Sequence, residues 1–367
     1  MMANDTTVPP RLDWIEVAKG IGITFVVLVH SMIPWLNPVT IHLSAFTIPI
    51  FFVLGGLTYN NDRHRDDLRS FAVSRGKQFL IPYFCLYIIM MILFVPLSPN
   101  IDTAFTPAEM AFWFLYGNGP PLSASHLWFL PVMYFGLMLF VVTDRLMHNL
   151  PRYSRVILAV VFPLLAMFVQ SLFVPNLVPW RLGGVLIAAT FVLFGNMMRH
   201  VKGLGAWLSN SKAVDVVLFS LLSILLVILS TLNGFTDIAV DNFGESMWLY
   251  VVAGMMGTSA VFIASSAVTY SSRVRNLFMA LGKNSQELYE IHPLAFYLVP
   301  LAAIALGISV GPLEFVQIFW PLRFILGVII AFILTRYVII RYRILSIMFR
   351  GSPRIDPPSQ TKSSSNG

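Results

Sequence analysis

Long apolar stretches alternate with short polar ones along almost the whole chain. Each stretch has about twenty residues, the length at which an α-helix crosses the hydrocarbon core of a bilayer. The pattern therefore predicts an all-α polytopic membrane protein with about ten transmembrane helices. The predicted spans are residues 14–36, 40–59, 78–97, 126–143, 155–174, 181–198, 213–232, 247–269, 285–305 and 317–340.

The basic residues divide the connecting loops into two classes and so predict the orientation of the helices. The loops on one side, together with Lys19, Arg155 and Arg336 at span edges, hold 22 of the 24 lysines and arginines. The opposite loops hold none, and we place the remaining Arg181 and Arg323 at the outer ends of their spans. Because basic loops stay in the cytoplasm, both termini are predicted to be cytoplasmic. The basic segments are residues 1–13, 60–77, 144–154, 199–212, 270–284 and 341–367.

The chain divides into a polar cytoplasmic tail (1–13), a transmembrane domain (14–340) and a second cytoplasmic tail (341–367). The second tail is basic at first and, from residue 351, rich in proline and serine, a composition typical of disorder. The first apolar span is followed by no small-residue cleavage site, so we expect the N-terminal tail to be retained. Residues 60–77 are expected to be partly helical and interfacial, and "AEMAFWFLYGN" in the outer loop 98–125 is too short to span.

Composition supports the membrane assignment and limits the function. Apolar residues make up 57% of the chain and charged residues 11%, with a mean hydropathy of +0.77. The pI near 9.6 does not indicate nucleic-acid binding, because the basic residues follow membrane topology. One cysteine, Cys85, excludes an intramolecular disulfide. With no soluble catalytic domain and no nucleotide-binding loop in the sequence, any chemistry is expected inside the helix bundle.

One apolar span carries two ionisable residues on the same side of its helix. Within "EVAKGIGITFVVLVHS", residues 16–31, Lys19 and His30 are eleven positions apart. Eleven residues make about three helical turns, so both side chains share one face, roughly 16 Å apart along the axis. Ionisable groups inside a membrane are costly and usually functional. Structural interpretations remain open: His30 as a strut between helices, and Lys19 as a residue that reaches the interface beside Glu16.

Further candidates lie in "SRGKQFLIPYF", "SHLWFLP" and "LGKNSQELYEIHPL". Arg75 and Lys77 also fit a topology signal. His126 is expected at the outer surface beside Trp128, and Trp128 fits an interfacial anchor. Glu287 and Glu290 share a helix face, where they pair with a basic residue or lie near the interface. His292 precedes a proline, an arrangement typical of a helix kink. Their co-occurrence favours a functional site. The candidates are Arg75, Lys77, His126, Trp128, Glu287, Glu290 and His292.

Five motifs in this order resemble the membrane-bound acyltransferase-3 family, over residues 11 to about 340. They are "RLDWIEVAKGIGITFVVLVH", "IPIFFVLGGLTY", "SRGKQFLIPYF", "HLWFLP" and "LGKNSQELYEIHP". The resemblance is greatest to the branch of fucose-4-O-acetylase-like and exopolysaccharide (xanthan-type) O-acetyltransferases. It implies an enzyme that transfers acetyl from cytoplasmic acetyl-CoA to a sugar hydroxyl at the outer face.

The resemblance also implies roles for particular residues. Lys19 and His30 match the family's basic residue, ten others and essential histidine, which makes His30 the catalytic residue. Arg75 matches the first arginine of an Arg-x-x-Arg motif, but Gln78 replaces the second, so the donor-binding role of that position is open and Lys77 is a substitute. Gly55 stands where the family has serine. The late glycine-asparagine-serine-histidine motif fits Gly282, Asn284, Ser285 and His292, and Glu287 and Glu290 replace residues that are more often apolar.

The implied donor site comprises Lys19, Arg75 and Lys77, which bind the phosphates of acetyl-CoA as co-substrate. The expected acceptor-binding or supporting residues are Glu16, His126, Trp128, Glu287, Glu290 and His292, and Trp113, Trp128 and Phe129 offer flat surfaces to a saccharide ring. No metal and no nucleic acid is implied. The implied partners are a lipid-linked saccharide, the bilayer and other polysaccharide-assembly proteins, and the implied location is the bacterial inner membrane.

Several alternatives stay open at this stage. His30 acts either as a general base or as an acetyl carrier. The acceptor is an exopolysaccharide unit, an O-antigen or another glycan, and the donor carries acetyl or succinyl. A transporter or flippase for a lipid-linked saccharide would also bury charges in about ten spans, but it predicts paired broken helices in two halves, and the sequence shows no such symmetry. A structural or sensing protein is a third class.

Overall fold

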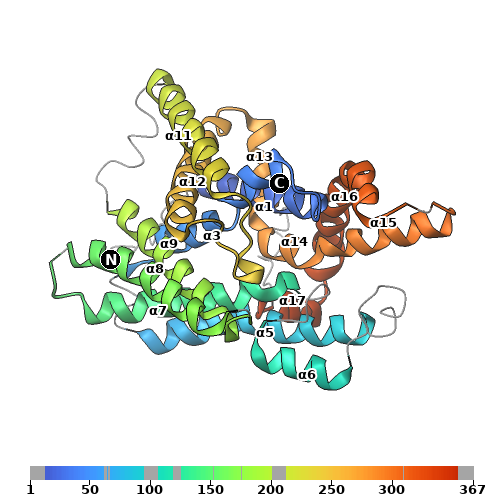
Figure 1. Ribbon diagram of the computed structural model, residues 1–367, viewed down its shortest axis with the longest axis horizontal. Coiled ribbons are helices and arrows are strands. Elements are labelled where there is room, and N and C mark those ends of the chain that lie inside the picture. Colours follow the sequence, from blue (N-terminus) through green and yellow to red (C-terminus); the bar gives the residue numbers. More distant parts are fainter. Residues whose placement is uncertain are drawn as a thin grey trace, which may run out of the picture.

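The computed structural model shows a bundle of α-helices (Figure 1). It describes residues 13–61, 64, 67–94, 106–118, 125–151, 153–174, 176–200, 212–308 and 310–353. These residues contain no β-strand and one isolated bridge, between Asp237 and Asn242. The tails outside residues 13–353, including the segment that we expect to be disordered, lie beyond the described part of the chain.

The helices follow one another with short connections. In chain order they are α1 (Asp13–Met32), α2 (Pro38–Ser44), α3 (Pro49–Leu57), α5 (Leu68–Phe94), α6 (Pro107–Tyr116), η2 (Ser125–Trp128), α7 (Phe129–Leu146), α8 (Tyr153–Phe173), η3 (Pro179–Arg181), α9 (Leu182–Arg199), α11 (Lys212–Asn233), η4 (Ile238–Val240), α12 (Met247–Val268), α13 (Ser272–Lys283), α14 (Ser285–Ile291), α15 (Pro293–Ala305), α16 (Pro312–Leu334), η5 (Thr335–Ile339) and α17 (Arg343–Arg350).

Nine helical stretches of the described chain are long and apolar enough to cross a membrane, and each overlaps a predicted span. Of the remaining predicted span, 78–97, residues 78–94 form the C-terminal part of α5, whose N-terminal part carries Arg69, Arg75 and Lys77, and the last three residues lie outside the described part of the chain. The prediction of an all-α multi-pass membrane protein is confirmed. Arg323, predicted at the outer end of its span, lies near the middle of α16 and is buried, and it donates to the carbonyl of Ile33, just past the end of α1.

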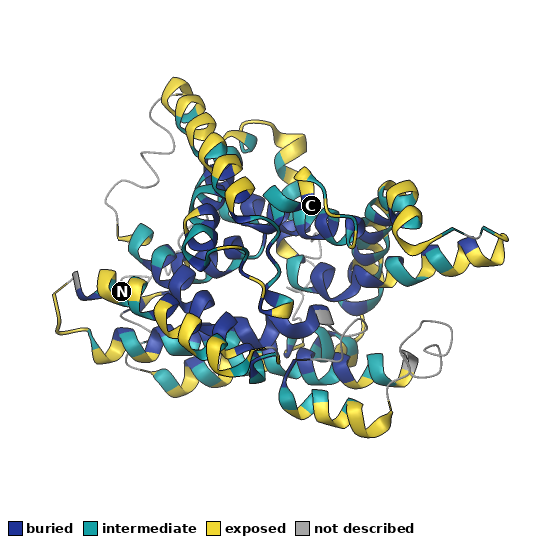
Figure 2. Ribbon diagram, in the orientation of Figure 1, coloured by how far each residue is buried: buried dark blue, intermediate teal, exposed yellow. Residues whose placement is uncertain are grey.

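The spans differ in how deeply they are packed (Figure 2). In the span that contains α9, 78% of the residues in its 18-residue apolar stretch are buried, whereas the same share in α11 is 11%. Helices α1, α3, α7, α9 and α12 form the centre, and the exposed side chains of α8, α11 and α16 are largely apolar. Apolar side chains on the outside of the bundle are favourable only in contact with lipid, so this arrangement fits a protein surrounded by a bilayer.

Two central spans are interrupted, and both interruptions involve proline. The second span breaks between α2 and α3, and α3 begins at Pro49. The span of residues 285–305 breaks at His292, and α15 begins at Pro293. Proline lacks the N–H that would continue the helix, so each break leaves backbone carbonyls available to other donors. These breaks bring irregular backbone into the middle of the bundle.

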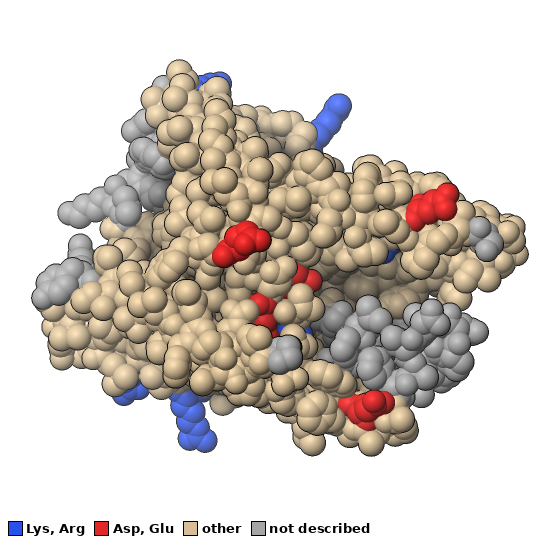
Figure 3. Space-filling view, viewed as in Figure 1, with Lys and Arg blue, Asp and Glu red and all other residues tan. Residues whose placement is uncertain are grey.

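One face of the molecule has the charge character expected of the outer loops. Figure 3 shows the face that carries α6 and the connection between α11 and α12, where acidic atoms are exposed and lysine and arginine atoms lie mainly at the edge. Helix α6 contains the short apolar piece of the predicted outer loop and packs through Phe114 against Phe84 and Tyr87. This largely apolar helix is therefore a separate short element, as its length predicts.

Candidate active site

Three histidines from distant parts of the chain meet inside the bundle. His30 Nδ1, on α1, lies 2.8 Å from His292 Nε2 at the break between α14 and α15. The two rings are parallel, with centroids 5.0 Å apart. His126, on η2, approaches His292 with a centroid distance of 6.1 Å. His126 is buried and not at the outer surface, which corrects the sequence-based placement, because η2 turns its ring inward to the break.

The break at Pro293 determines which nitrogens of the histidine pair carry protons. Because Pro293 has no N–H, the carbonyl of Tyr289 lacks its helical partner and lies 2.7 Å from His292 Nδ1. A carbonyl only accepts, so His292 Nδ1 donates, and a neutral His292 then presents a lone pair at Nε2. His30 Nδ1 must donate to that lone pair, which leaves His30 Nε2 as the basic nitrogen. The arrangement thus prepares His30 to accept a proton.

A chain of amide and carboxyl groups runs from His126 toward the side of the bundle that carries the basic loops. We call this the cytoplasmic side, as the loop charges predict. Gln286 Nε2 donates to Glu290 Oε1 at 3.1 Å and to the Gln78 carbonyl at 3.0 Å. Glu290 is buried, its Oε2 has no hydrogen-bond partner among the described residues, and its backbone carbonyl lies 3.3 Å from His126 Nε2. Glu290 therefore lies inside the bundle beside His126 and not at the interface.

Gln78 turns out to be central although it departs from the family motif. Arg75 Nη1 donates to Gln78 Oε1 at 2.6 Å, and Gln78 Nε2 lies 3.4 Å from Gln286 Oε1. The guanidinium of Arg75 also lies over the Phe71 ring at 5.5 Å. Lys77, one residue earlier on α5, lines a cavity that is larger than the one lined by Arg75. Gln78 thus orients Arg75. Arg75 and Lys77 each line a cavity.

Lys19 lies at the cytoplasmic end of the helix face that carries His30. Its Nζ is 3.3 Å from Glu16 Oε1, and the Glu16 side chain is buried. Helix α13 packs closely here: a Cβ on Gly282 would lie 1.9 Å from the Glu16 carbonyl oxygen, so only glycine fits. Because α1 is one continuous helix from Asp13 to Met32, Lys19 and His30 keep the helical spacing expected from the sequence.

Three cavities follow one another past these residues. The largest, about 970 Å³, opens on the cytoplasmic side and is lined by Lys19, Lys77 and Gln78, among others. A second of about 170 Å³ shares Lys19 and Gln78 with it and adds Arg75 and apolar side chains. A third of about 40 Å³ contains His30 and shares Ile48 and Tyr289 with the second. The three cavities therefore lie next to one another, in a series that runs from the cytoplasmic side to His30. We call this series the route.

The third cavity also reaches the outer connection between α11 and α12. Its lining includes Trp128, Thr236 and Asp237 beside His30. Trp128 is buried, so it is part of the cavity wall and not an exposed aromatic anchor. Asp237 uses one carboxylate oxygen to accept from the Ala239 N–H at 2.9 Å. Burial raises the pKa of Asp237, although the Ala239 N–H and the positive charge of Arg181 oppose that rise.

Arg181 and Asp241 form an ion pair beside this outer end of the route. Arg181 Nη1 lies 3.6 Å from Asp241 Oδ2, which also accepts from the Val178 N–H at 3.1 Å. Burial raises the pKa of Asp241, and Arg181 opposes the rise. The pair fixes the start of α9 against the connection that carries Asp237.

Several site residues are not evident from the sequence alone. Gln286 lies within the last quoted motif but is not one of the residues that define it, although it stands four positions before Glu290 and therefore on the same helix face. Arg323 donates to the Ile33 carbonyl at 3.4 Å and lies over the Phe296 ring at 4.7 Å, next to the break at His292. Its signal was its position inside an apolar span. Asp237 had none, since an acidic loop residue is ordinary.

Glu287 and Trp113 are placed away from the histidines. Glu287 is buried and forms an ion pair with Arg350 of α17 on the cytoplasmic side. Trp113 lies on α6 against Phe112 and Tyr116. Phe129 is buried against Phe51 and Phe52, where it lines the second cavity. In the described part of the chain no group of three or more histidine, cysteine or acidic side chains is arranged to hold a metal ion.

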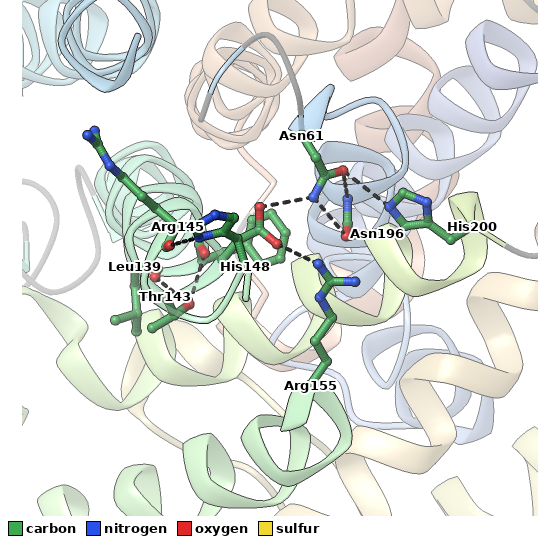
Figure 4. Close-up of polar contacts among 10 residues, drawn as sticks. Asn61, Leu139, Thr143, Arg145, His148, Arg155, Asn196 and His200 are labelled. Carbon is green, nitrogen blue, oxygen red and sulfur yellow. Dashed lines mark hydrogen bonds and ion pairs between the residues drawn. The ribbon is translucent and has the colours of Figure 1, made fainter. Parts of the chain in front are cut away.

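A second polar cluster, built around the buried Asn61, Asp144 and Asn196, lies near the cytoplasmic ends of α7, α8 and α9 (Figure 4). Asp144 accepts from Asn61 at 3.0 Å and from Arg155 at 3.0 Å. Asn196 Nδ2 donates to Asn61 Oδ1 at 2.8 Å, and His200 Nε2 lies 3.3 Å from the same oxygen. None of these residues lines the three cavities above. This network therefore joins helices without facing a ligand space.

Comparison with known families accounts for most of the chain. The model of the acyltransferase-3 family, described as an acyltransferase domain, matches residues 12–338. That range contains all three histidines and all three cavities except for the part of the first cavity formed by α17. No curated protein and no solved structure matches the chain.

Proposed function

The chain belongs to the acyltransferase-3 family and is a multi-pass membrane acyltransferase, and from this premise we propose that it is an O-acetyltransferase. Acetyl-CoA binds from the cytoplasmic side, and the acceptor is a sugar hydroxyl at the outer side. The acceptor that fits best is a lipid-linked repeat unit of an exopolysaccharide, in the bacterial inner membrane. The observation that carries this proposal is the position of His30, which lines the small outer cavity at the end of the series that begins with the cationic cytoplasmic cavity.

The donor fits the cytoplasmic half of the route. The largest cavity presents the cationic groups of Lys19 and Lys77, which suit the phosphates of the CoA nucleotide. The narrow second cavity, lined by Phe51, Leu54 and Phe79, suits the flexible pantetheine arm. Lys19 lines both cavities, so it lies where the nucleotide would give way to the arm. The thioester then lies toward His30, about three helical turns further along α1.

The acceptor approaches from the opposite end. The outer cavity offers a carboxylate, a hydroxyl and an aromatic ring, from Asp237, Thr236 and Trp128. These groups suit a sugar, whose hydroxyls donate to carboxylates and whose apolar face packs on rings. The cavity volume of about 40 Å³ holds little more than the reacting hydroxyl, so the rest of the saccharide lies outside it.

The chemistry follows from the proton arrangement of the histidine pair. His30 Nε2 takes the proton of the sugar hydroxyl while its oxygen attacks the thioester carbonyl. The carbon–sulfur bond breaks, the acetyl group passes to the sugar oxygen, and the CoA thiolate takes the proton from His30. The positive charge on His30 during the step is stabilised by the lone pair of His292 Nε2 at 2.8 Å. In the alternative route, His30 Nε2 attacks the thioester first and carries the acetyl group.

The test is an acetylation assay on membranes containing the protein. Labelled acetyl-CoA is incubated with fractionated lipid-linked oligosaccharides, and labelled succinyl-CoA serves as the competing donor. We expect label from acetyl-CoA in a saccharide fraction. Transfer from succinyl-CoA alone, or label in no saccharide, contradicts the proposal. Label retained on the protein in the absence of acceptor distinguishes the acetyl-histidine route from direct transfer.

A further inference from the structure

Helix α17 is packed against the donor side of the protein although it lies beyond the family match. The match ends at residue 338, and α17 runs from Arg343 to Arg350. It contacts α5, α14 and η5, and Phe349 packs against the hydrophobic core. The other side of the helix is exposed, with Ile344 pointing outward. The chain therefore carries a helix beyond the matched range, on the cytoplasmic side of the acyltransferase domain.

Polar contacts fix α17 to the segment that leads into His292. Arg350 forms an ion pair with Glu287, and its Nη2 donates to Asn284 Oδ1 at 3.2 Å. Gln286 Nε2 lies 3.2 Å from the Phe349 carbonyl. Three nearly consecutive residues at the start of α14 thus hold the last turn of α17. The same Gln286 contacts Glu290 and Gln78, so α17 is joined to the network around the donor route.

The end of α17 also fits closely against α5. Gly351 closes the helix with φ of +71°, a left-handed conformation that favours glycine. A Cβ at this position would lie 1.6 Å from the carbonyl oxygen of Lys77. Gly307 has nearly the same conformation, φ of +74°, but nothing lies within 4 Å of its missing Cβ. Gly351 can approach Lys77 only because it has no side chain, whereas a side chain at Gly307 would meet open space.

The cavity beside α17 carries an excess of positive charge. Among the described residues that line the cavity of about 970 Å³, five are lysine or arginine and two are glutamate. The cationic residues are Lys19, Lys77, Lys283, Arg336 and Arg350, and the acidic ones are Glu16 and Glu287. Such a cavity attracts an anion with several charges. Arg350 supplies a planar guanidinium, the group that matches phosphate geometry best, and Glu287 holds it in place.

We propose that α17 is a wall of the donor site and that Arg350 binds a phosphate of the CoA nucleotide. This proposal rests on the proposed function, since it takes acetyl-CoA as the donor. Gly351 lets the helix end approach Lys77, so that Arg350 and Lys77 face the same anion. The competing role is that of an amphipathic helix that only anchors the chain at the membrane interface.

The test measures ligand binding to the purified full chain and needs no acceptor. Acetyl-CoA is titrated by calorimetry, and S-acetylpantetheine, which lacks the phosphates, is measured by competition. For Arg350→Gln we expect acetyl-CoA to bind about tenfold more weakly, with little change for S-acetylpantetheine. Arg343→Gln, at the exposed start of the same helix, is the matched control and keeps the affinity of the unaltered protein.

A second pair of variants tests the placement of the helix. Gly351→Ala should weaken acetyl-CoA binding, whereas Gly307→Ala, with the same backbone conformation in open space, should not. Unchanged acetyl-CoA binding in both Arg350→Gln and Gly351→Ala overturns the proposal and leaves α17 as an interfacial anchor. If the unaltered protein itself does not bind acetyl-CoA, the proposed donor is wrong, and the phosphate role of Arg350 falls with it. The two failures are therefore seen in different samples.

Discussion

Two clusters of buried polar side chains lie in the same bundle and differ in what surrounds them. The cluster around Asp144 is closed: its amides, carboxylate and guanidinium bond to one another, and it lines none of the three cavities. The cluster around His30 is open, because His30 lines a cavity and has a neighbour of the same chemical type at 2.8 Å. Burial of polar groups alone therefore does not identify a reaction centre.

The difference assigns different tasks to the two clusters. In a closed network every bonding group is used by another, which fixes the helices relative to one another. In the open cluster the backbone break at Pro293 sets the proton positions and leaves Nε2 as the basic nitrogen of His30, whose side chain lines a cavity. Substitutions in the first should therefore reduce stability, and substitutions in the second should reduce turnover.

The largest expected effect belongs to His30→Gln. Glutamine keeps hydrogen-bonding capacity but cannot accept and return a proton, so acetyl transfer should fall by about a hundredfold to ten-thousandfold. The protein should still be inserted at normal levels. Activity per amount of membrane-inserted protein is the measurement, with His148→Gln, an exposed histidine outside the cavities, as the control. Transfer at the control rate would make His30 a structural strut.

A smaller loss is expected for His292→Gln, which removes the group that sets the proton position on His30. The loss of one charge-assisted hydrogen bond costs about 1.5–3 kcal/mol, which corresponds to a tenfold to hundredfold decrease in kcat. The affinity for acetyl-CoA should be unchanged. A positioning role further predicts that the pH dependence of kcat shifts, because the basicity of His30 changes. If kcat is preserved, or only expression changes, His292 does not act through His30.

The closed cluster should respond in the opposite way. Asp144→Asn keeps the shape of the side chain and its contact with Asn61 but removes the ion pair with Arg155. The free energy of unfolding should therefore fall by about 1.5–3 kcal/mol. Thermal unfolding of the purified protein measures this effect, and Glu314→Gln on an exposed helix start is the control. Specific activity of the folded fraction should be unchanged. A selective loss of activity without loss of stability would contradict the division between the clusters.

The smallest expected effect concerns Asp237 at the outer end of the route. Burial raises its pKa, so as the pH falls its carboxylate is protonated earlier than an exposed one and no longer accepts a sugar hydroxyl. The KM for the acceptor should therefore rise a few-fold at acid pH, and Asp237→Asn should abolish this dependence. Initial rates are measured in right-side-out vesicles loaded with acetyl-CoA, so that the pH is varied on the acceptor side alone. A pH dependence that persists in Asp237→Asn would assign it to another group.

Much of the fold could be predicted because the bilayer restricts it strongly. Runs of about twenty apolar residues have few alternatives to a spanning helix, and nine of the predicted spans appear as such helices in the described residues. The depth of individual side chains was harder to predict. Arg323 lies in the middle of α16, and His126 is turned inward, since both depend on packing between helices and not on position along one helix.

The candidate site was predicted in part. The spacing of Lys19 and His30 is a property of one helix, so it could be predicted from the sequence. The contact of His30 with His292 joins residues 262 positions apart, and no local pattern determines it. The roles of Gln78 and Gln286 depend on the contact between α5 and α14, and the sequence of neither helix predicts that contact.

The most direct test of the central claim uses sealed vesicles of known orientation, because the claim is transfer across the membrane through His30. Vesicles contain a lipid-linked saccharide and receive labelled acetyl-CoA from outside only. In inside-out vesicles, which expose the cytoplasmic face, we predict label on saccharide inside the lumen, and none when the vesicles contain His30→Gln. Labelling in right-side-out vesicles, or equal labelling with His30→Gln, would contradict the account.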